Sequence, residues 1–185
     1  EWQKMDVKVG SRDVERQTWT TQAGMTYLFA SDPERLARQL RSGGVLDLRL
    51  VPTDEADRAH RYQFPVPASA EAVDQVLQAC GRPLTDDRDS LPRLAVDVTW
   101  ANRPTPYYPD NDSAVAARAG RVVLSCIIGD DMHVRDCRVE SEEPAHAGFA
   151  ASAIRSAEAA RIDPKGDPSS VRGRVIRFPI TFRLP

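Results

Sequence analysis

The sequence predicts an α+β fold made of two small domains. Its 185 residues are enough for two domains that each bury a core. The first half mixes short strand patterns with two helix patterns, and the second half follows a β-β-α-β order. A stretch rich in proline and charge separates the halves. We therefore expect a β-rich domain with two helices at residues 1–84, a linker at 85–98 and a second domain at 99–185.

The strands expected in the first half are short. Candidates lie at residues 5–9, 16–21 and 25–30, and the alternation in "VLDLRLV" at 45–51 predicts a strand with one buried face. A further strand at 61–67 contains Pro65 and Pro67. Because proline has no backbone N–H to donate, we expect these prolines at an edge of the sheet or at an end of the strand.

Two helices are expected in the same half. In "SDPERLARQLRSGG", Ser31 or Asp32 serves as the N-cap, Pro33 suits the first turn and Gly43 ends the helix. In "ASAEAVDQVLQACG", Ser69 is the N-cap. The apolar residues of this second helix share one face: Val73, Val76, Leu77 and Cys80. This spacing favours Cys80 as a small core residue over a reactive thiol.

The charged run after the second helix marks the domain boundary. Asp86, Asp87, Arg88 and Asp89 alternate in sign between prolines. Such a run is more typical of a solvated linker than of a cation site.

The second half contains clearer patterns. Strands are expected at 120–128 and 133–142, a helix at 144–162 and a final strand at 174–185, after an extended segment at 94–100 and a proline-rich one at 103–109. The helix carries an apolar stripe of Phe149, Ala153, Ile154 and Ala157. The final strand alternates, with Ile176, Phe178, Ile180, Phe182 and Leu184 on one face. One helix packed on an antiparallel sheet satisfies both patterns.

Cys126 and Cys137 flank the turn between the first two of these strands. A hairpin with Asp131 and Met132 at its tip places the two cysteines directly opposite each other, which favours a disulfide. Two unlinked thiols are the alternative. A zinc site with His133 is less favoured, because no further Cys or His follows at ligand spacing.

Composition and motifs argue against several classes of function. The net charge of −2 provides no field that would attract nucleic acid, and no run of apolar residues is long enough to span a membrane. The sequence has no nucleophile elbow, phosphate loop or metalloprotease motif, so we expect neither catalysis nor a metal or cofactor.

Because the chain begins at Glu1 without an initiator Met, we expect a signal peptide or an anchor upstream.

From Trp100 to Pro185 the chain resembles the C-terminal domain of TonB-family proteins of the Gram-negative envelope. The resemblance is carried, in order, by "YYP" at 107–109, "GRVVLSC" from Gly120, "RDCRVESEEP", "GFAASAIRSA" from Gly148 and the closing "GRVIRFPITFRLP". It implies a periplasmic module that binds envelope proteins, including an outer-membrane TonB-dependent transporter, by adding a partner strand to its sheet. The alternative is an envelope structural or stress protein that uses the domain for self-association, as a homodimer, or for internal docking.

The partner-binding residues that we expect lie on two segments, the "YYP" arm and the last strand: Tyr107, Tyr108, Pro109, Arg177, Phe178, Pro179 and Thr181. Tyr107 and Tyr108 are equally explicable as packing residues. Pro179 is tolerated only if its nitrogen faces no neighbour, which makes the last strand an open edge. Pro179 either protects that edge against aggregation or leaves a gap that a partner strand tolerates.

The hairpin tip departs from the family pattern, and the N-terminal region carries a second resemblance. Met132 stands where the family usually has Gly at the hairpin tip, so we expect a loop wider than two residues. In the N-terminal region, "GGVLDLRL" and "YQFPVPASAEAVDQVLQAC" resemble the invasion-associated locus B family, which is also exported to the periplasm. This second resemblance implies a location and no defined activity.

Overall fold

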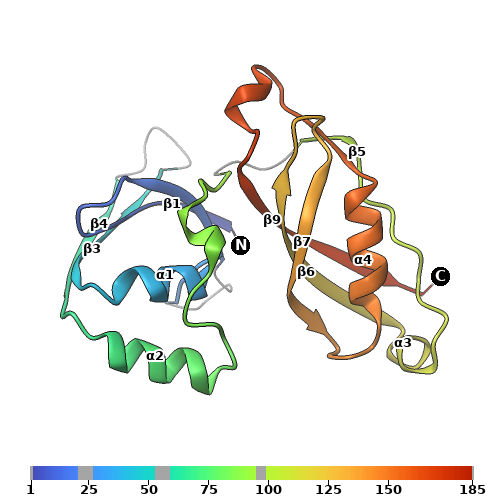
Figure 1. The fold of residues 1–185 in the computed structure, drawn as a ribbon, viewed down its shortest axis with the longest axis horizontal. Coiled ribbons are helices and arrows are strands. Elements are labelled where there is room, and N and C mark those ends of the chain that lie inside the picture. The colour runs from blue at the N-terminus through green and yellow to red at the C-terminus, as the bar shows by residue number, and fades with distance from the viewer. Residues whose placement is uncertain (1, 21–26, 53–58, 95–98, 185) are drawn as a thin grey trace. The chain divides into compact units, whose positions relative to one another are not determined.

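The structure is a computed structural model that describes residues 2–20, 27–52, 59–94 and 99–184. The chain divides into two compact units, Glu1–Ser90 and Leu91–Pro185. Each unit combines an antiparallel sheet with helices (Figure 1), which confirms the predicted α+β class.

The first unit is built on a four-stranded sheet in the order β2-β1-β3-β4. Its strands are β1 (Trp2–Val9), β2 (Glu15–Thr20), β3 (Gly44–Leu50) and β4 (Arg61–Val66). β4 lies at an edge, as Pro65 predicted. The strand expected at 25–30 falls partly outside the described residues, and in its described part Phe29 forms an isolated bridge with Thr20.

Helix α1 (Pro33–Leu40) packs against this sheet, and α2 (Ala70–Ala79) lies beyond α1 (Figure 1). Both helices were predicted, and Gly43 has the positive φ of 68° that a helix C-terminus favours. The prediction for Cys80 was wrong, because this thiol is exposed. Since α2 does not lie on the sheet, Leu77 is the buried residue of its apolar face, while Val76 is 61% exposed.

A row of arginines on α1 holds the first unit together. Spaced three residues apart, they occupy one side of the helix and bind carboxylates on three other elements. The pairs are Arg35 with Glu15 of β2, Arg38 with Asp89, and Arg41 with Asp74 of α2. Burial disfavours the charged form of Arg35, but the hydrogen bonds and the charge of Glu15 outweigh it and raise its pKa.

The charged run at 86–89 is not a solvated linker. Residues Asp87–Ser90 form a 3-10 helix, and Asp89 accepts two hydrogen bonds from Arg38 at 2.5 and 2.8 Å. Arg88 is buried, with 4% of its surface exposed. Asp86 and Asp89 thus pair with Arg38 of α1, and within the run Asp87 is the exposed charge.

The second unit has a three-stranded antiparallel sheet in the order β7-β6-β9. β6 spans Ala119–Ile128, β7 spans Val134–Glu143 and β9 spans Val175–Arg183. Helix α4 (Phe149–Glu158) covers one face, which confirms the predicted β-β-α-β order. Short elements add to it: β5 (Thr99–Asn102), α3 (Asp112–Ala117), β8 (Arg161–Asp163) and a 3-10 helix at Pro168–Ser170. The helix expected to reach residue 162 stops earlier because residues 161–163 pair with β5 as β8.

Phe149 is the centre of the second core. Its ring is fully buried beside Phe182, with 4.8 Å between ring centroids. Gly120 of β6 lies directly against it, and a Cβ there would come within 2.5 Å of the ring. Ala153 and Ala157 of the predicted stripe are also buried. Their small side chains let α4 approach the sheet closely.

We predict that Arg35→Ala destabilises the first unit by about 3 kcal/mol, because it removes the buried cation and both hydrogen bonds that Arg35 donates to Glu15. Arg16→Ala is the matched control, since Arg16 pairs with Asp6 across an exposed surface and should contribute below about 1 kcal/mol. Urea unfolding followed by tryptophan fluorescence measures both values. Equal losses in the two variants would contradict the central role of the row.

Candidate functional site

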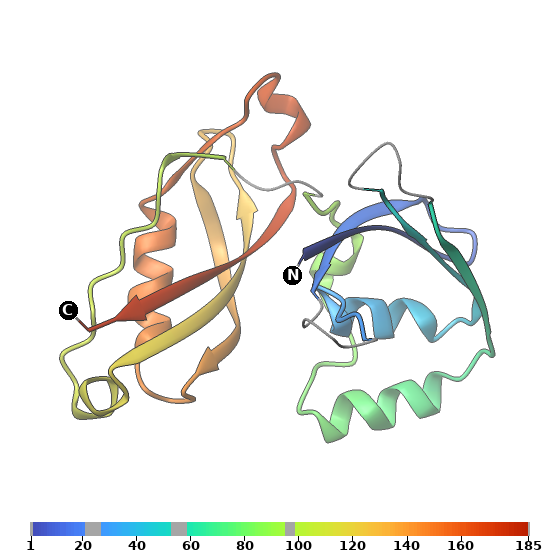
Figure 2. The same cartoon turned by 180° about the vertical axis from the view of Figure 1, so that it is seen from behind.

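The strand β9 forms one edge of the second sheet (Figure 2). It pairs with β6 through nine consecutive residue pairs, from Val175 opposite Ile127 to Arg183 opposite Ala119, without a register shift. Such a regular ladder leaves every second backbone N–H and C=O of β9 directed away from β6.

Pro179 fits within this ladder because of that alternation. It lies opposite Val123, and the pairing continues on both sides of it. Its nitrogen therefore faces away from β6, and the backbone groups of Arg177 and Thr181 face the same way. The edge therefore presents one N–H donor on each side of Pro179, which itself has none.

The other edge of the sheet is less suited to a partner strand. The pairing of β7 with β6 shifts register twice, between Val123 and Leu124 and between Ser125 and Ile127. The second shift coincides with a positive φ of 50° at Asp136. Bulges of this kind twist an edge and interrupt its row of backbone groups. The regular strand β9 is therefore the better candidate.

The beginning of β9 is already occupied. Residues 92–94 run parallel to it, with hydrogen bonds of 2.9 Å from Leu94 N to Val175 O and from Val175 N to Pro92 O. These residues belong to the segment expected as a linker, for which no strand pairing was predicted. Within the described residues, the edge available to a partner runs from Arg177 to Arg183.

The side chains of the expected site residues on β9 divide into two groups. Phe178 packs into the core, with its ring 5.0 Å from that of Trp100. Pro179 and Thr181 are exposed, whereas Arg177 is half-buried and its Nε–H is buried without an acceptor among the described residues. Phe178 thus fixes the strand, while Pro179 and Thr181 face the surroundings.

The two tyrosines of the "YYP" arm have different environments. Tyr107 is 88% exposed, whereas Tyr108 packs edge-on against Phe149 and donates a hydrogen bond of 2.7 Å to the carbonyl of Ala114. Ser152 of α4 donates a hydrogen bond to the carbonyl of Tyr107. The arm is therefore fixed beside α4, with Tyr107 as its exposed side chain and Pro109 half-buried.

A disulfide joins Cys126 and Cys137, with the Cα atoms 4.2 Å apart. Ser125 lies opposite Arg138, so the two cysteines are neighbours across the ladder, as the sequence predicted. Cys126 is fully buried on the face covered by α4. The bond therefore ties β7 to β6, the strand that also carries β9.

The hairpin tip is wider than two residues, as Met132 predicted. Gly129 N donates to His133 O at 2.8 Å, which leaves Asp130, Asp131 and Met132 in the loop. Met132 still takes a positive φ of 66°, and its buried side chain together with a 2.9 Å hydrogen bond from Ile162 N holds it there. The His133 N–H and the charge of Arg135 lower the pKa of Asp131.

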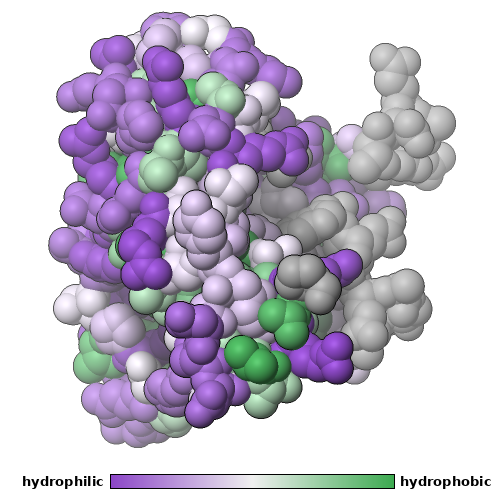
Figure 3. All heavy atoms as spheres, turned by 90° about the vertical axis from the view of Figure 1, so that its right-hand side faces the viewer, coloured by the Kyte–Doolittle hydropathy of each residue, from purple (hydrophilic) through white to green (hydrophobic). Residues whose placement is uncertain are grey.

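Metal-binding clusters and membrane-spanning helices were both sought among the described residues. They contain no group of three or more His, Cys, Asp or Glu that could hold a metal ion. None of their helices is long and apolar enough to cross a membrane. On the face seen in Figure 3, hydrophilic side chains predominate and hydrophobic ones lie singly or in small groups.

The second unit is a small α+β domain with a regular strand at one edge of its sheet, a geometry to which a partner strand can add. The family model of the Gram-negative bacterial TonB protein C-terminal domain matches residues 104–184. The second unit therefore carries a domain of the TonB C-terminal family, a family of interaction domains of the bacterial envelope. Searches of curated proteins and of solved structures found no match. The resemblance of the N-terminal region to the invasion-associated locus B family stays a prediction.

We predict that replacing both Cys126 and Cys137 by Ala lowers the unfolding free energy of the second unit by about 2–3 kcal/mol, because the bond closes a loop with a sequence separation of 11. Cys80→Ala is the control and should change stability by less than about 0.5 kcal/mol, since that thiol is exposed. Denaturant unfolding without reductant measures both. A double variant as stable as the parent would show that the bond does not brace the hairpin.

Proposed function

We propose that the second unit binds an extended segment of another envelope protein, which adds as a strand beside β9 between Arg177 and Arg183. The observation that carries this proposal is the unbroken register of β9 with β6, which leaves a regular row of backbone groups on the outer side. Main-chain hydrogen bonds to such an edge supply affinity, and the side chains beside it supply specificity.

The family supplies the setting for the proposal. TonB C-terminal domains work in the periplasm of Gram-negative bacteria, so the partner class that we propose is an outer-membrane TonB-dependent transporter. The disulfide between Cys126 and Cys137 fits an oxidising compartment of this kind. Coupling to energy-dependent transport is part of the same proposal.

Pro179 sets the strength of this interaction. Each backbone hydrogen bond contributes about 0.5–1.5 kcal/mol, and the partner strand finds no donor at Pro179. Binding at this edge is therefore weaker than at an uninterrupted one. The same gap limits edge-to-edge pairing between copies of the chain.

We predict that Pro179→Val tightens binding of an extended transporter peptide by about 2–10-fold, because it restores one outward N–H. Thr181→Pro should weaken binding by a similar factor, because it removes a donor on the same side. Fluorescence anisotropy with a labelled synthetic peptide from the periplasm-facing segment of a TonB-dependent transporter measures both effects.

Two outcomes would count against the transporter. Absence of binding by both the parent chain and Pro179→Val would exclude this peptide as a partner strand. Sedimentation velocity of the same samples tests the alternative of self-association. A concentration-dependent dimer that Thr181→Pro abolishes would assign the edge to a second copy of the chain instead.

A further inference from the structure

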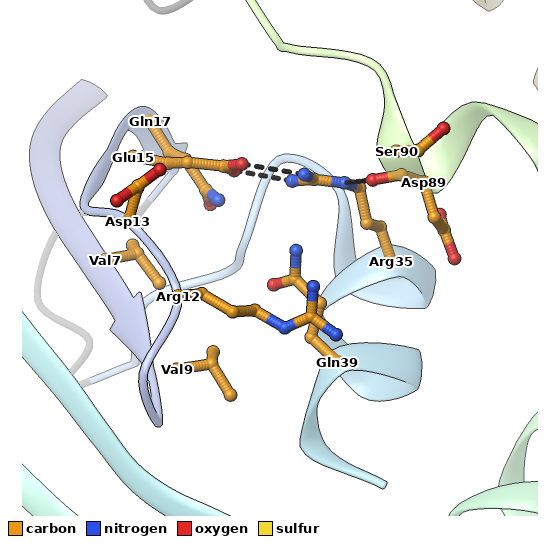
Figure 4. A pocket seen from close by; sticks show the side chains of 10 residues that line it. All are labelled: Val7, Val9, Arg12, Asp13, Glu15, Gln17, Arg35, Gln39, Asp89 and Ser90. Atoms are coloured by element: carbon orange, nitrogen blue, oxygen red, sulfur yellow. Dashed lines mark hydrogen bonds and ion pairs between the residues drawn. The ribbon is translucent and has the colours of Figure 1, made fainter. Parts of the chain in front are cut away.

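The first unit contains a polar pocket that the proposed function of the second unit does not use. Its volume is about 260 Å³, and it opens between the β1–β2 hairpin and α1 (Figure 4). Val7 and Val9 of β1 supply an apolar wall, and the remaining lining comes from the hairpin, α1 and the 3-10 helix. A pocket of this size is below the range for drug-sized ligands and suits a molecule of a few heavy atoms.

Most charges around the pocket are already neutralised within the unit. Arg35 donates two hydrogen bonds to the carboxylate of Glu15. Asp89 is held in the same way by Arg38, and its backbone carbonyl accepts from Arg35 Nε at 3.3 Å. In Figure 4 the hydrogen bonds of Arg35 join Glu15 to Asp89 along one side of the pocket, so these groups are not free to bind a ligand.

Two other lining groups remain available. Gln39 is only 9% exposed as a residue, its side-chain amide makes no hydrogen bond with another described residue, and in Figure 4 the amide points into the pocket. Arg12 is exposed on the hairpin turn, and its guanidinium lies beside Gln39 in Figure 4. No hydrogen bond or ion pair joins Arg12 to another described side chain.

We propose that this pocket binds a small aliphatic monocarboxylate, with Arg12 and Gln39 holding the carboxylate and Val7 and Val9 contacting the hydrocarbon stem. A guanidinium with its fork of N–H donors matches a planar carboxylate. The uncompensated Asp13 at the pocket repels a second negative charge, so a monoanion fits better than a phosphate dianion.

The experiment is a ¹H–¹⁵N NMR titration of the full chain with sodium butyrate. Saturable shifts are expected at Val7, Val9, Arg12 and Gln39. Butyramide, which is isosteric and uncharged, should produce none, and inorganic phosphate should bind more weakly. Arg12→Gln should weaken butyrate binding by about ten-fold or more, because a charged hydrogen-bonding group is lost. Arg49→Gln is the control, because Arg49 is exposed on β3 outside the pocket lining.

Gln39→Leu separates binding from folding. It should weaken butyrate binding while leaving the unfolding midpoint about the same, because the amide that it removes makes no hydrogen bond within the described structure. Equal shifts with butyrate and butyramide, tighter binding of phosphate, or unchanged affinity in Arg12→Gln would each overturn the proposal. Absence of saturable shifts in the parent chain would overturn it as well.

Discussion

The alternating direction of backbone groups along β9 is the constraint on which the interaction face depends. One half of these groups is consumed by β6, so the other half must face either a partner or water. The same alternation turns Phe178 into the core and leaves Pro179 and Thr181 exposed. The strand β9 is thus a structural edge and also the recognition surface that we propose, and the burial of its inner side chains fixes the position of the outer ones.

The two units are stabilised in different ways. The second has an extensive apolar core around Phe149, whereas the buried core cluster of the first comprises Met5, Val7 and Trp19. In the first unit, the ion pairs of Arg35, Arg38 and Arg41 supply part of the stabilisation that the small apolar core does not. Because such pairs require partners at defined positions, they also shape the polar pocket in which Gln39 is left without one.

Much of the fold could be predicted where one physical pattern dominates. Pro65 and Pro179 predicted two edge strands, because a residue without an N–H is tolerated in a sheet only where no neighbouring strand needs that donor. The alternation of the strands also placed Cys126 opposite Cys137. Long-range pairing could not be predicted. The exposure of Cys80 depends on α2 lying beyond α1, and the burial of Arg88 and the pairing of Asp89 depend on a helix some fifty positions away in the chain. The pocket also depends on such contacts, because Arg12 is separated from Gln39 in sequence and neither belongs to a recognisable motif.

The parallel bridge between residues 92–94 and Val175 has a mechanical consequence. The chain enters the second unit along the same edge that we assign to a partner, so any pull transmitted from the first unit first loads the hydrogen bonds of Val175 with Pro92 and Leu94. The disulfide lies on the far side of β6 and is not in the path of that load. Tension along the chain would therefore release the start of the edge before it disturbed the core, lengthening the backbone row that a partner strand can reach.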